Sequence, residues 1–237
     1  MARWLALDFA QTEATVAIGD GATLVCEHAF PARLASENGM TEIARLLAET
    51  GTRASNLDAL AWISGPGRFT GLRIAAATIQ GLSWVWQKPV ASVPGLAVMA
   101  YACRKAGLTV PVFACLDARM GELYWACYRI AEGIWPEGDL HVGGGASVHL
   151  DDGDWTGVGE VLERPDLQDL RKRLARLEPA APARAGNLLP LAELAWQGGR
   201  VQEAHTIGPL YVRHEVTDRD APTLPVTRTG YDTGEQE

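Results

Sequence analysis

Short apolar runs alternate along this chain with segments whose apolar residues recur at helical spacing. Runs at 4–8, 15–18 and 22–26 predict three consecutive antiparallel strands, because Gly19-Asp20-Gly21 favours a tight hairpin turn between the last two. Further strands are expected at 57–63, 89–93, 112–117, 123–127 and 207–216, with a turn-rich β-like stretch reaching residue 158. Helices are expected at 36–50, from the end of a glycine-rich loop to about residue 86, and at 95–106, 165–177 and 189–197.

The second half of the chain echoes the first. A strand, an aspartate, a turn and a second strand occur around Asp8 and again around Asp117. Chance similarity between two hairpins is the alternative, but a repeat at this distance indicates a duplicated domain rather than a solenoid, whose period is roughly 20–50 residues. The predicted units are a first subdomain at 1–106, a second at 107–216 and a mobile tail at 217–237, whose composition offers little to bury.

Charge and composition narrow the function classes. The chain has 237 residues, 47% of them hydrophobic and 21% charged, with a formal net charge of −8. Nucleic-acid binding depends on Lys and Arg neutralising phosphates, so stand-alone RNA binding is not expected. No stretch approaches the ~20 apolar residues of a membrane span, and the few residues before Asp8 are too short for a signal-peptide core. We therefore expect a cytoplasmic protein without a membrane partner.

Metal and nucleophile motifs are missing from the sequence. None of the five histidines lies three or four residues from another, the spacing that places two imidazoles on one helix face. Cys26 and His28 would share one face of a strand, but two ligands do not make a site. None of the four cysteines forms a C-x-x-C pair, and there is no G-x-S-x-G elbow. We expect no metal, no cofactor and no peptidase machinery.

The glycine-rich turn after the strand at 57–63 is the sharpest local feature. A strand, a glycine loop and a helix can aim backbone N–H groups at an anion. The spacing Gly65-x-Gly67-x3-Gly71 is neither G-x-G-x-x-G nor a P-loop, so dinucleotide binding is disfavoured. We expect these glycines to permit a tight turn and the close approach of another backbone.

Two aspartates leave a catalytic alternative open. Asp8 and Asp117 each stand at a strand end, where acids coordinate magnesium in duplicated ATPases. The loops that follow contain few Gly, Ser and Thr residues and each contains an acid, so they would cradle phosphate poorly. A stand-alone ATPase or kinase using these two acids is the alternative function.

Five segments carry a resemblance to a known family. They are Leu5-Ala-Leu-Asp8, Glu13-Ala-Thr-Val-Ala17, Gly65-Pro-Gly-Arg-Phe-Thr-Gly-Leu-Arg73, Leu116-Asp-Ala-Arg-Met-Gly-Glu-Leu-Tyr124 and Tyr211-Val-Arg-His-Glu-Val216. Together they resemble the TsaB (YeaZ) family over about residues 3–216. The signature loop is the most specific of them, and its residues are Gly65, Pro66, Gly67, Arg68, Phe69, Thr70, Gly71 and Arg73.

The resemblance implies an α/β fold of the ASKHA class (actin, hexokinase and Hsp70 ATPase-like), a duplicated ribonuclease H-like fold that has lost catalysis. It implies a non-catalytic subunit that binds a TsaD-like catalytic subunit, works with a TsaE-like ATPase to make threonylcarbamoyladenosine in tRNA, and meets tRNA only through that complex. Two N-terminal helices would bind the partner, or a second copy when the chain is alone. Carried over by position, the interface is Met40, Ile43, Leu47, Leu72, Ala76 and Ile79.

Two departures from the family pattern bear on phosphate binding and on the interface contacts of the first helix. The family usually has D-T-S/A after the first strand, whereas Phe9 and Ala10 follow Asp8 here, and Phe9 would crowd a phosphate. The first helix lacks the family's usual His-Ser start and reads Ala35-Ser-Glu-Asn-Gly39 instead. Older labels for such chains as M22-type peptidase homologues leave peptidase activity as a third alternative.

Overall fold

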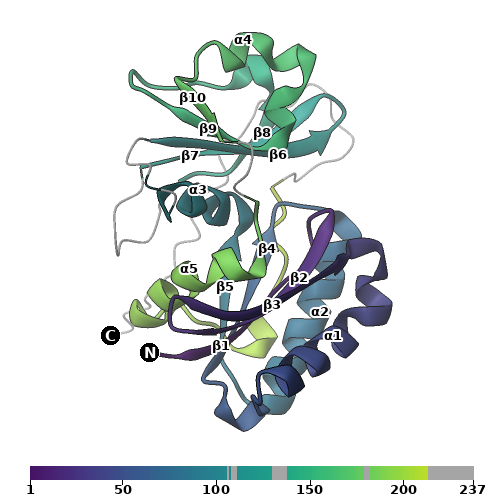
Figure 1. Ribbon diagram of the computed structural model, residues 1–237. Helices are drawn as coiled ribbons and strands as arrows, with labels where there is room; N and C mark the ends of the chain where they lie inside the picture. Colours follow the sequence, from purple (N-terminus) through teal and green to yellow (C-terminus); the bar gives the residue numbers. More distant parts are fainter. Residues whose placement is uncertain (106, 108–110, 130–137, 179–181, 213–237) are drawn as a thin grey trace, which may run out of the picture.

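The computed structural model describes residues 1–105, 107, 111–129, 138–178 and 182–212. Two lobes stand one above the other, each built around a five-stranded sheet (Figure 1). The strands are β1 (Arg3–Asp8), β2 (Glu13–Asp20), β3 (Thr23–Pro31), β4 (Ala59–Gly65), β5 (Val90–Pro94), β6 (Val112–Arg119), β7 (Glu122–Tyr128), β8 (His141–Gly144), β9 (Thr156–Val158) and β10 (Arg176–Glu178). The helices are α1 (Ala35–Glu49), α2 (Phe69–Trp86), α3 (Gly95–Lys105), α4 (Gln168–Arg171) and α5 (Ala185–Gln197).

The two sheets share one topology. The order β3-β2-β1-β4-β5 combines an antiparallel meander with two parallel additions, β1 to β4 and β4 to β5. The second sheet repeats this plan, with β8-β7-β6 antiparallel and β9 and β10 added in parallel beside β6. This confirms the duplication indicated by the two aspartate-bearing hairpins and gives the chain its ASKHA-like fold.

The central strands of the first sheet are buried on both faces. In β1, Leu5 and Leu7 point into a core shared with α1 and α2, while Trp4 and Ala6 point to the opposite face. Successive side chains of a strand alternate between faces, so a run that is apolar at every position requires cover on both sides. The apolar run at 4–8 is therefore explained by two helical layers.

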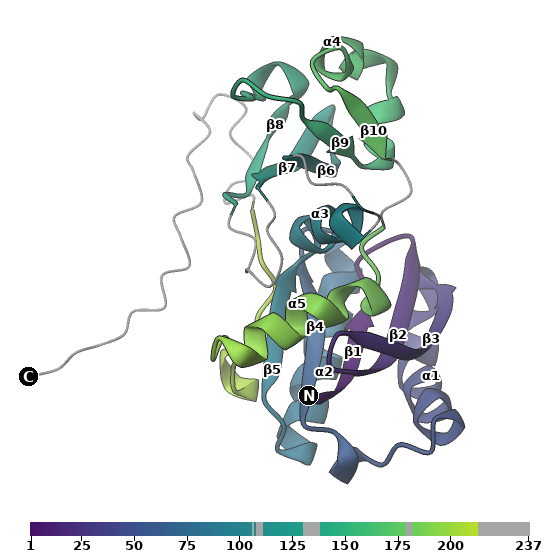
Figure 2. The same ribbon diagram turned by 60° about the vertical axis from the view of Figure 1, so that its left-hand side comes forward.

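Helix α5 returns from the second half of the chain to cover the first sheet. Figure 2 shows α5 crossing these strands on the face opposite α1. The indole N–H of Trp4 donates to Glu193 Oε2 at 3.1 Å, and the backbone N–H of Ala185 donates to Thr15 Oγ1 at 2.9 Å. Because α3 contacts strands of both sheets, one apolar cluster runs through both lobes.

Two predicted elements are wrong within the described residues. The helix expected at 165–177 is a short 3-10 turn followed by α4, and the chain then re-enters the second sheet as β10. The strand expected at 207–216 is absent from its described part, 207–212. There the Leu210 N–H donates to the Ser64 carbonyl at 2.8 Å and the Gln80 side chain donates to the Ile207 carbonyl at 2.6 Å. The segment is held by separate contacts to α2 and the end of β4, and its last residues and the tail at 217–237 lie outside the described residues.

Candidate interaction surface and the covered strand end

Asp8 lies at the end of β1 and has no solvent exposure. Its Oδ1 accepts the backbone N–H of Ala10 at 2.8 Å, and its Oδ2 has no hydrogen-bond partner among the described residues. Burial raises the pKa of this carboxyl to about 7, against the opposing effect of the Ala10 hydrogen bond. A carboxyl group in this position is partly neutral at physiological pH and is not accessible from solvent.

Asp117 occupies the equivalent strand end in the second lobe, and its surroundings differ. It repeats the local hydrogen bond, since its Oδ1 accepts the backbone N–H of Arg119 at 2.9 Å. Its side chain is 42% exposed and is ion-paired with Arg164 at 3.3 Å. The duplicated aspartates thus share a backbone turn, but only the second is accessible to solvent.

The chain's own backbone fills the space beside the glycine loop. A Cβ placed on Gly71 would lie 2.0 Å from the Phe9 carbonyl oxygen, and one on Gly67 would lie 2.7 Å from the Ala10 Cβ. The Arg68 N–H donates to the Ala10 carbonyl at 2.8 Å. This confirms the expectation that the loop permits a close backbone approach, and it leaves these residues packed against 9–10 rather than against an anion.

The Phe9 side chain does not lie where the sequence predicted. It is fully buried, meets Phe30 edge-on with ring centroids 5.8 Å apart, and lies beneath Gly39 of α1. Phe9 therefore does not crowd a phosphate with its ring. It secures the turn after β1 in the core, because burying a large aromatic side chain strongly favours that position.

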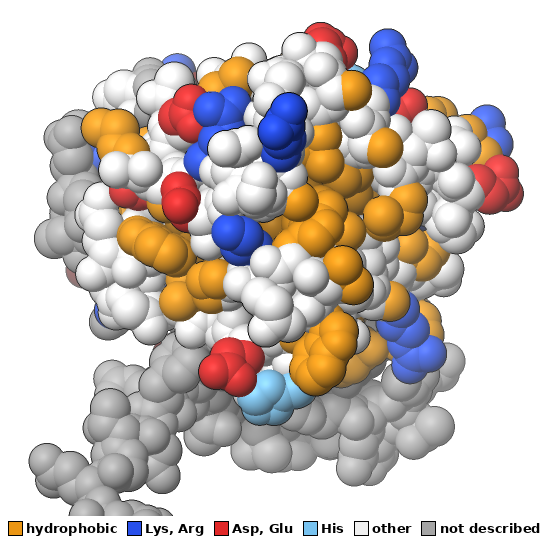
Figure 3. All heavy atoms as spheres, turned by 90° about the horizontal axis from the view of Figure 1, so that it is seen from below, with side chains coloured by type: hydrophobic (Ala, Val, Ile, Leu, Met, Phe, Trp, Pro, Cys, Tyr) orange, Lys and Arg blue, Asp and Glu red, His pale blue; other side chains and the backbone are white. Residues whose placement is uncertain are grey.

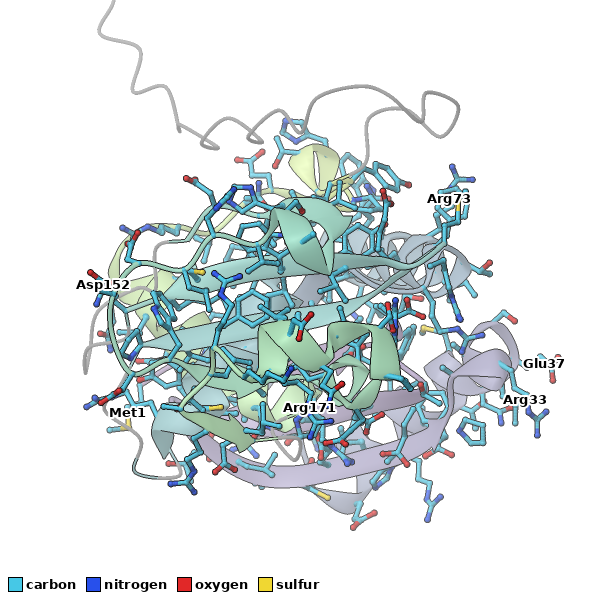
Figure 4. The ribbon with its side chains drawn as sticks, turned by 90° about the horizontal axis from the view of Figure 1, so that it is seen from above. Met1, Arg33, Glu37, Arg73, Asp152 and Arg171 are labelled. Atoms are coloured by element: carbon cyan, nitrogen blue, oxygen red, sulfur yellow. The ribbon has the colours of Figure 1, made fainter. Side chains whose placement is uncertain are left out.

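The first turn of α2 carries an exposed aromatic and cationic group. The Arg73 guanidinium lies 3.9 Å from the centroid of the Phe69 ring, and its Nε donates to the Tyr211 hydroxyl at 3.4 Å. Arg73 projects away from the body of the molecule (Figure 4). The sequence placed Tyr211 in a family motif, but its approach to α2 depends on the tertiary fold, since the two residues are 138 positions apart. Of the other loop residues, Pro66 is buried, and Arg68 and Thr70 are exposed.

The six apolar residues of α1 and α2 that the resemblance places at a partner interface differ in their exposure. Met40 is 55% exposed and Leu47 is half-buried. The other four pack inside this chain, and they are Ile43, Leu72, Ala76 and Ile79. Helical apolar spacing identifies the side of a helix that prefers cover, and here the chain's own first sheet covers that side.

A different stripe of α2 is open to solvent. Trp84 is 67% exposed and Val85 is 74% exposed, and Ala77 and Gly81 precede them at helical spacing. Seen from below, the lower lobe presents a broad hydrophobic patch bordered by basic side chains (Figure 3). Exposed apolar residues gathered on one surface mark an interaction site.

Gly81 lies on the open side of α2, away from the other described parts of the chain. A Cβ added there would meet nothing within 4 Å, and the residue lies inside a regular helix. Glycine at such a position costs about 1 kcal/mol relative to alanine. A small residue on an open helix face is typical of a site where a second helix approaches closely.

The family model described as TsaD, tRNA N6-adenosine threonylcarbamoyltransferase, matches residues 30–136. The chain is 32% identical over 228 residues to the tRNA threonylcarbamoyladenosine biosynthesis protein TsaB of Escherichia coli (strain K12), covering 93% of this chain and 98% of that protein. It is 27% identical over 132 residues to the protein of the same name from Bacillus subtilis (strain 168), covering 55% and 56%. YeaZ from Pseudomonas aeruginosa superposes with a TM-score of 0.77 at 33% identity, over 89% of this chain and 100% of that chain.

The buried Asp8 predicts a pH dependence of stability. Because its folded pKa is raised from 3.8 to about 7, the folded state holds a proton that the unfolded state has lost between these values. Unfolding free energy should therefore fall as pH rises from about 4 to about 7, by up to about 4 kcal/mol. Asp8→Asn keeps an acceptor for the Ala10 N–H and should remove this fall. Urea titrations across the pH range measure it, and parallel curves for the two proteins would contradict the assignment.

Two glycines of α2 predict opposite effects of the same substitution. Gly71→Ala would drive a methyl group into the Phe9 carbonyl and should lower the free energy of unfolding by at least about 2 kcal/mol. Gly81→Ala enters open space and should raise it by about 1 kcal/mol. Denaturant unfolding of both variants checks this, and equal effects would refute the packing of the loop against residues 9–10.

Proposed function

The chain belongs to the TsaB family of tRNA threonylcarbamoyladenosine biosynthesis proteins, and we propose that it is a non-catalytic subunit that binds and activates a TsaD-like catalytic subunit. Its part in tRNA modification follows from the family. The catalytic role is assigned to the partner because this chain's candidate acids are not arranged as a site. Asp8 is buried under its own loop, and Asp117 is ion-paired in the other lobe.

The open stripe of α2 is the observation that carries this proposal. Ala77, Gly81, Trp84 and Val85 form a surface of small and apolar residues that the described part of the chain leaves uncovered, with Met40 of α1 also exposed. A helix of a related fold could pack there in close contact, with Trp84 as a large anchor. Aromatic anchors surrounded by small residues are typical of the energetically dominant part of an interface.

The buried positions of α1 and α2 have a supporting role in this proposal. Ile43, Ala76 and Ile79 fix both helices on the first sheet, so that the outer stripe is presented on a rigid base. In the absence of the partner, the same stripe would pair with a second copy of the chain. A TsaE-like ATPase would join the assembled complex, and tRNA would be held by the partners, because the chain's net charge of −8 disfavours binding phosphates directly.

None of the helices in the described residues is long and apolar enough to cross a membrane. Trp84 and Val85, which are 67% and 74% exposed, stand on the outer side of a helix whose inner side packs on a sheet, as expected for a docking surface between folded subunits.

Neighbouring alanines of α2 provide the test of this interface. Ala77 is exposed, so Ala77→Arg should leave the fold intact and reduce copurification with a TsaD-like partner at least tenfold. Ala76 is only 6% exposed, so Ala76→Arg should instead unfold the chain. Gln168→Arg adds the same charge on the exposed side of α4 and should bind normally. Circular dichroism establishes folding, and unchanged binding by a folded Ala77→Arg variant would exclude this surface.

The alternative of a stand-alone ATPase is tested on the isolated chain. We expect no ATP hydrolysis above the buffer rate, because Asp8 is inaccessible and the loop glycines already contact residues 9–10. A phosphate-release assay with magnesium and ATP measures this. Turnover by the wild-type chain that disappears in Asp8→Asn would overturn the non-catalytic assignment.

A further inference from the structure

Three different metal-binding side chains meet where β3 lies against α1. Cys26 and His28 are two residues apart on β3, so their side chains point to the same face of the strand. Glu49 comes from the last turn of α1. Glu49 Oε1 lies 3.6 Å from Cys26 Sγ, and Glu49 Oε2 lies 2.9 Å from His28 Nε2. One ligand atom from each of the three residues falls within 4.8 Å of the others. The sequence indicated only the first two, because Glu49 is brought to them by tertiary packing.

A fourth residue fixes the orientation of the histidine. His28 Nδ1 lies 3.1 Å from Glu42 Oε2, and Glu42 precedes Glu49 by about two turns of α1. Both ring nitrogens thus face carboxylates, and a metal ion bound through Nε2 would replace the proton on that nitrogen while Nδ1 continues to donate to Glu42. A metal-binding histidine usually has such a carboxylate partner behind it, which sets the tautomer and raises ligand basicity.

The separations suit a tetrahedral zinc ion. Zinc bonds of ordinary length to sulfur, nitrogen and oxygen place the sulfur and oxygen about 3.6 Å apart and the nitrogen and oxygen about 3.4 Å apart. The two contacts go to different oxygens of the Glu49 carboxylate, at 3.6 Å from Cys26 Sγ to Oε1 and 2.9 Å from His28 Nε2 to Oε2, so a small rotation of this carboxylate would bring one oxygen to both partners. The Glu49 side chain is 55% exposed and free to make that adjustment, whereas His28 is 12% exposed and held in place.

We propose that Cys26, His28 and Glu49 bind a zinc ion, with Glu42 as the residue that orients the imidazole. A thiolate, an imidazole and a carboxylate form a donor set suited to zinc rather than to magnesium or calcium, which take oxygen ligands. The fourth position lies on the solvent side, beside exposed Glu49, and takes a water molecule. The ion ties the edge strand β3 to α1, so binding it stabilises the folded chain. This inference does not depend on the proposed function.

Cobalt and zinc titrations of the full chain, freed of tags and treated with a chelator, test the site. We expect one equivalent of Co²⁺ to produce a thiolate charge-transfer band in the near ultraviolet and Zn²⁺ to displace it. Cys26→Ser should abolish the band, and His28→Gln and Glu49→Gln should weaken Zn²⁺ binding at least about tenfold. Glu42→Gln, which changes only the residue behind the imidazole, should weaken it by about 10–100-fold.

Two matched controls separate this site from adventitious binding. Cys127→Ser removes another half-buried thiol, and Glu37→Gln removes an exposed carboxylate from the first turn of the same helix. Both should bind like the wild type, and Zn²⁺ should raise the melting temperature of the wild type but not of Cys26→Ser. Failure of the wild-type chain to bind one equivalent, or survival of the cobalt band in Cys26→Ser, would overturn the proposal.

Discussion

The contact between the turn after β1 and the glycine loop before α2 is the constraint on which the first lobe depends. Gly67 and Gly71 allow the backbone of residues 9–10 to lie where any side chain would collide with it. The contact places the start of α2, covers Asp8 and turns Phe9 into the core beneath α1. This close contact between residues 9–10 and the glycine loop therefore sets the position of both outer helices on the sheet. It also closes the end of β1 to solvent.

The two lobes differ in how deeply their equivalent aspartates are buried rather than in their strand topology. Both lobes have the same strand order, and Asp8 and Asp117 make the same local hydrogen bond. In the first lobe helices cover both faces and the aspartate is buried, whereas in the second the equivalent aspartate remains in contact with solvent. The strand order has thus stayed the same in both lobes. The surroundings of the two aspartates differ, and so does the chemistry that each aspartate can take part in.

The outer surface of the first lobe combines two features, an open helix face and a side-chain cluster. An open helix face retains a glycine at the expense of helix stability, and Trp84 and Val85 stand in water beside it. On the neighbouring side, the Cys26, His28 and Glu49 cluster joins β3 to α1. Both features act on the same helical layer, one at its exposed stripe and the other where it is anchored to the sheet edge.

The sequence by itself determined the hairpins, the long helices, the duplication and the family, because these depend on local periodicity, turn residues and a specific glycine motif. Only the tertiary structure decided which side of α1 and α2 remains open, since apolar spacing marks a face that prefers cover without saying what covers it. Ala76 and Ala77 are adjacent in the sequence, yet one lies against the sheet and the other in solvent. The same limit applies to Tyr211 and Glu49, because contacts between distant segments arise from packing rather than from any pattern along the chain.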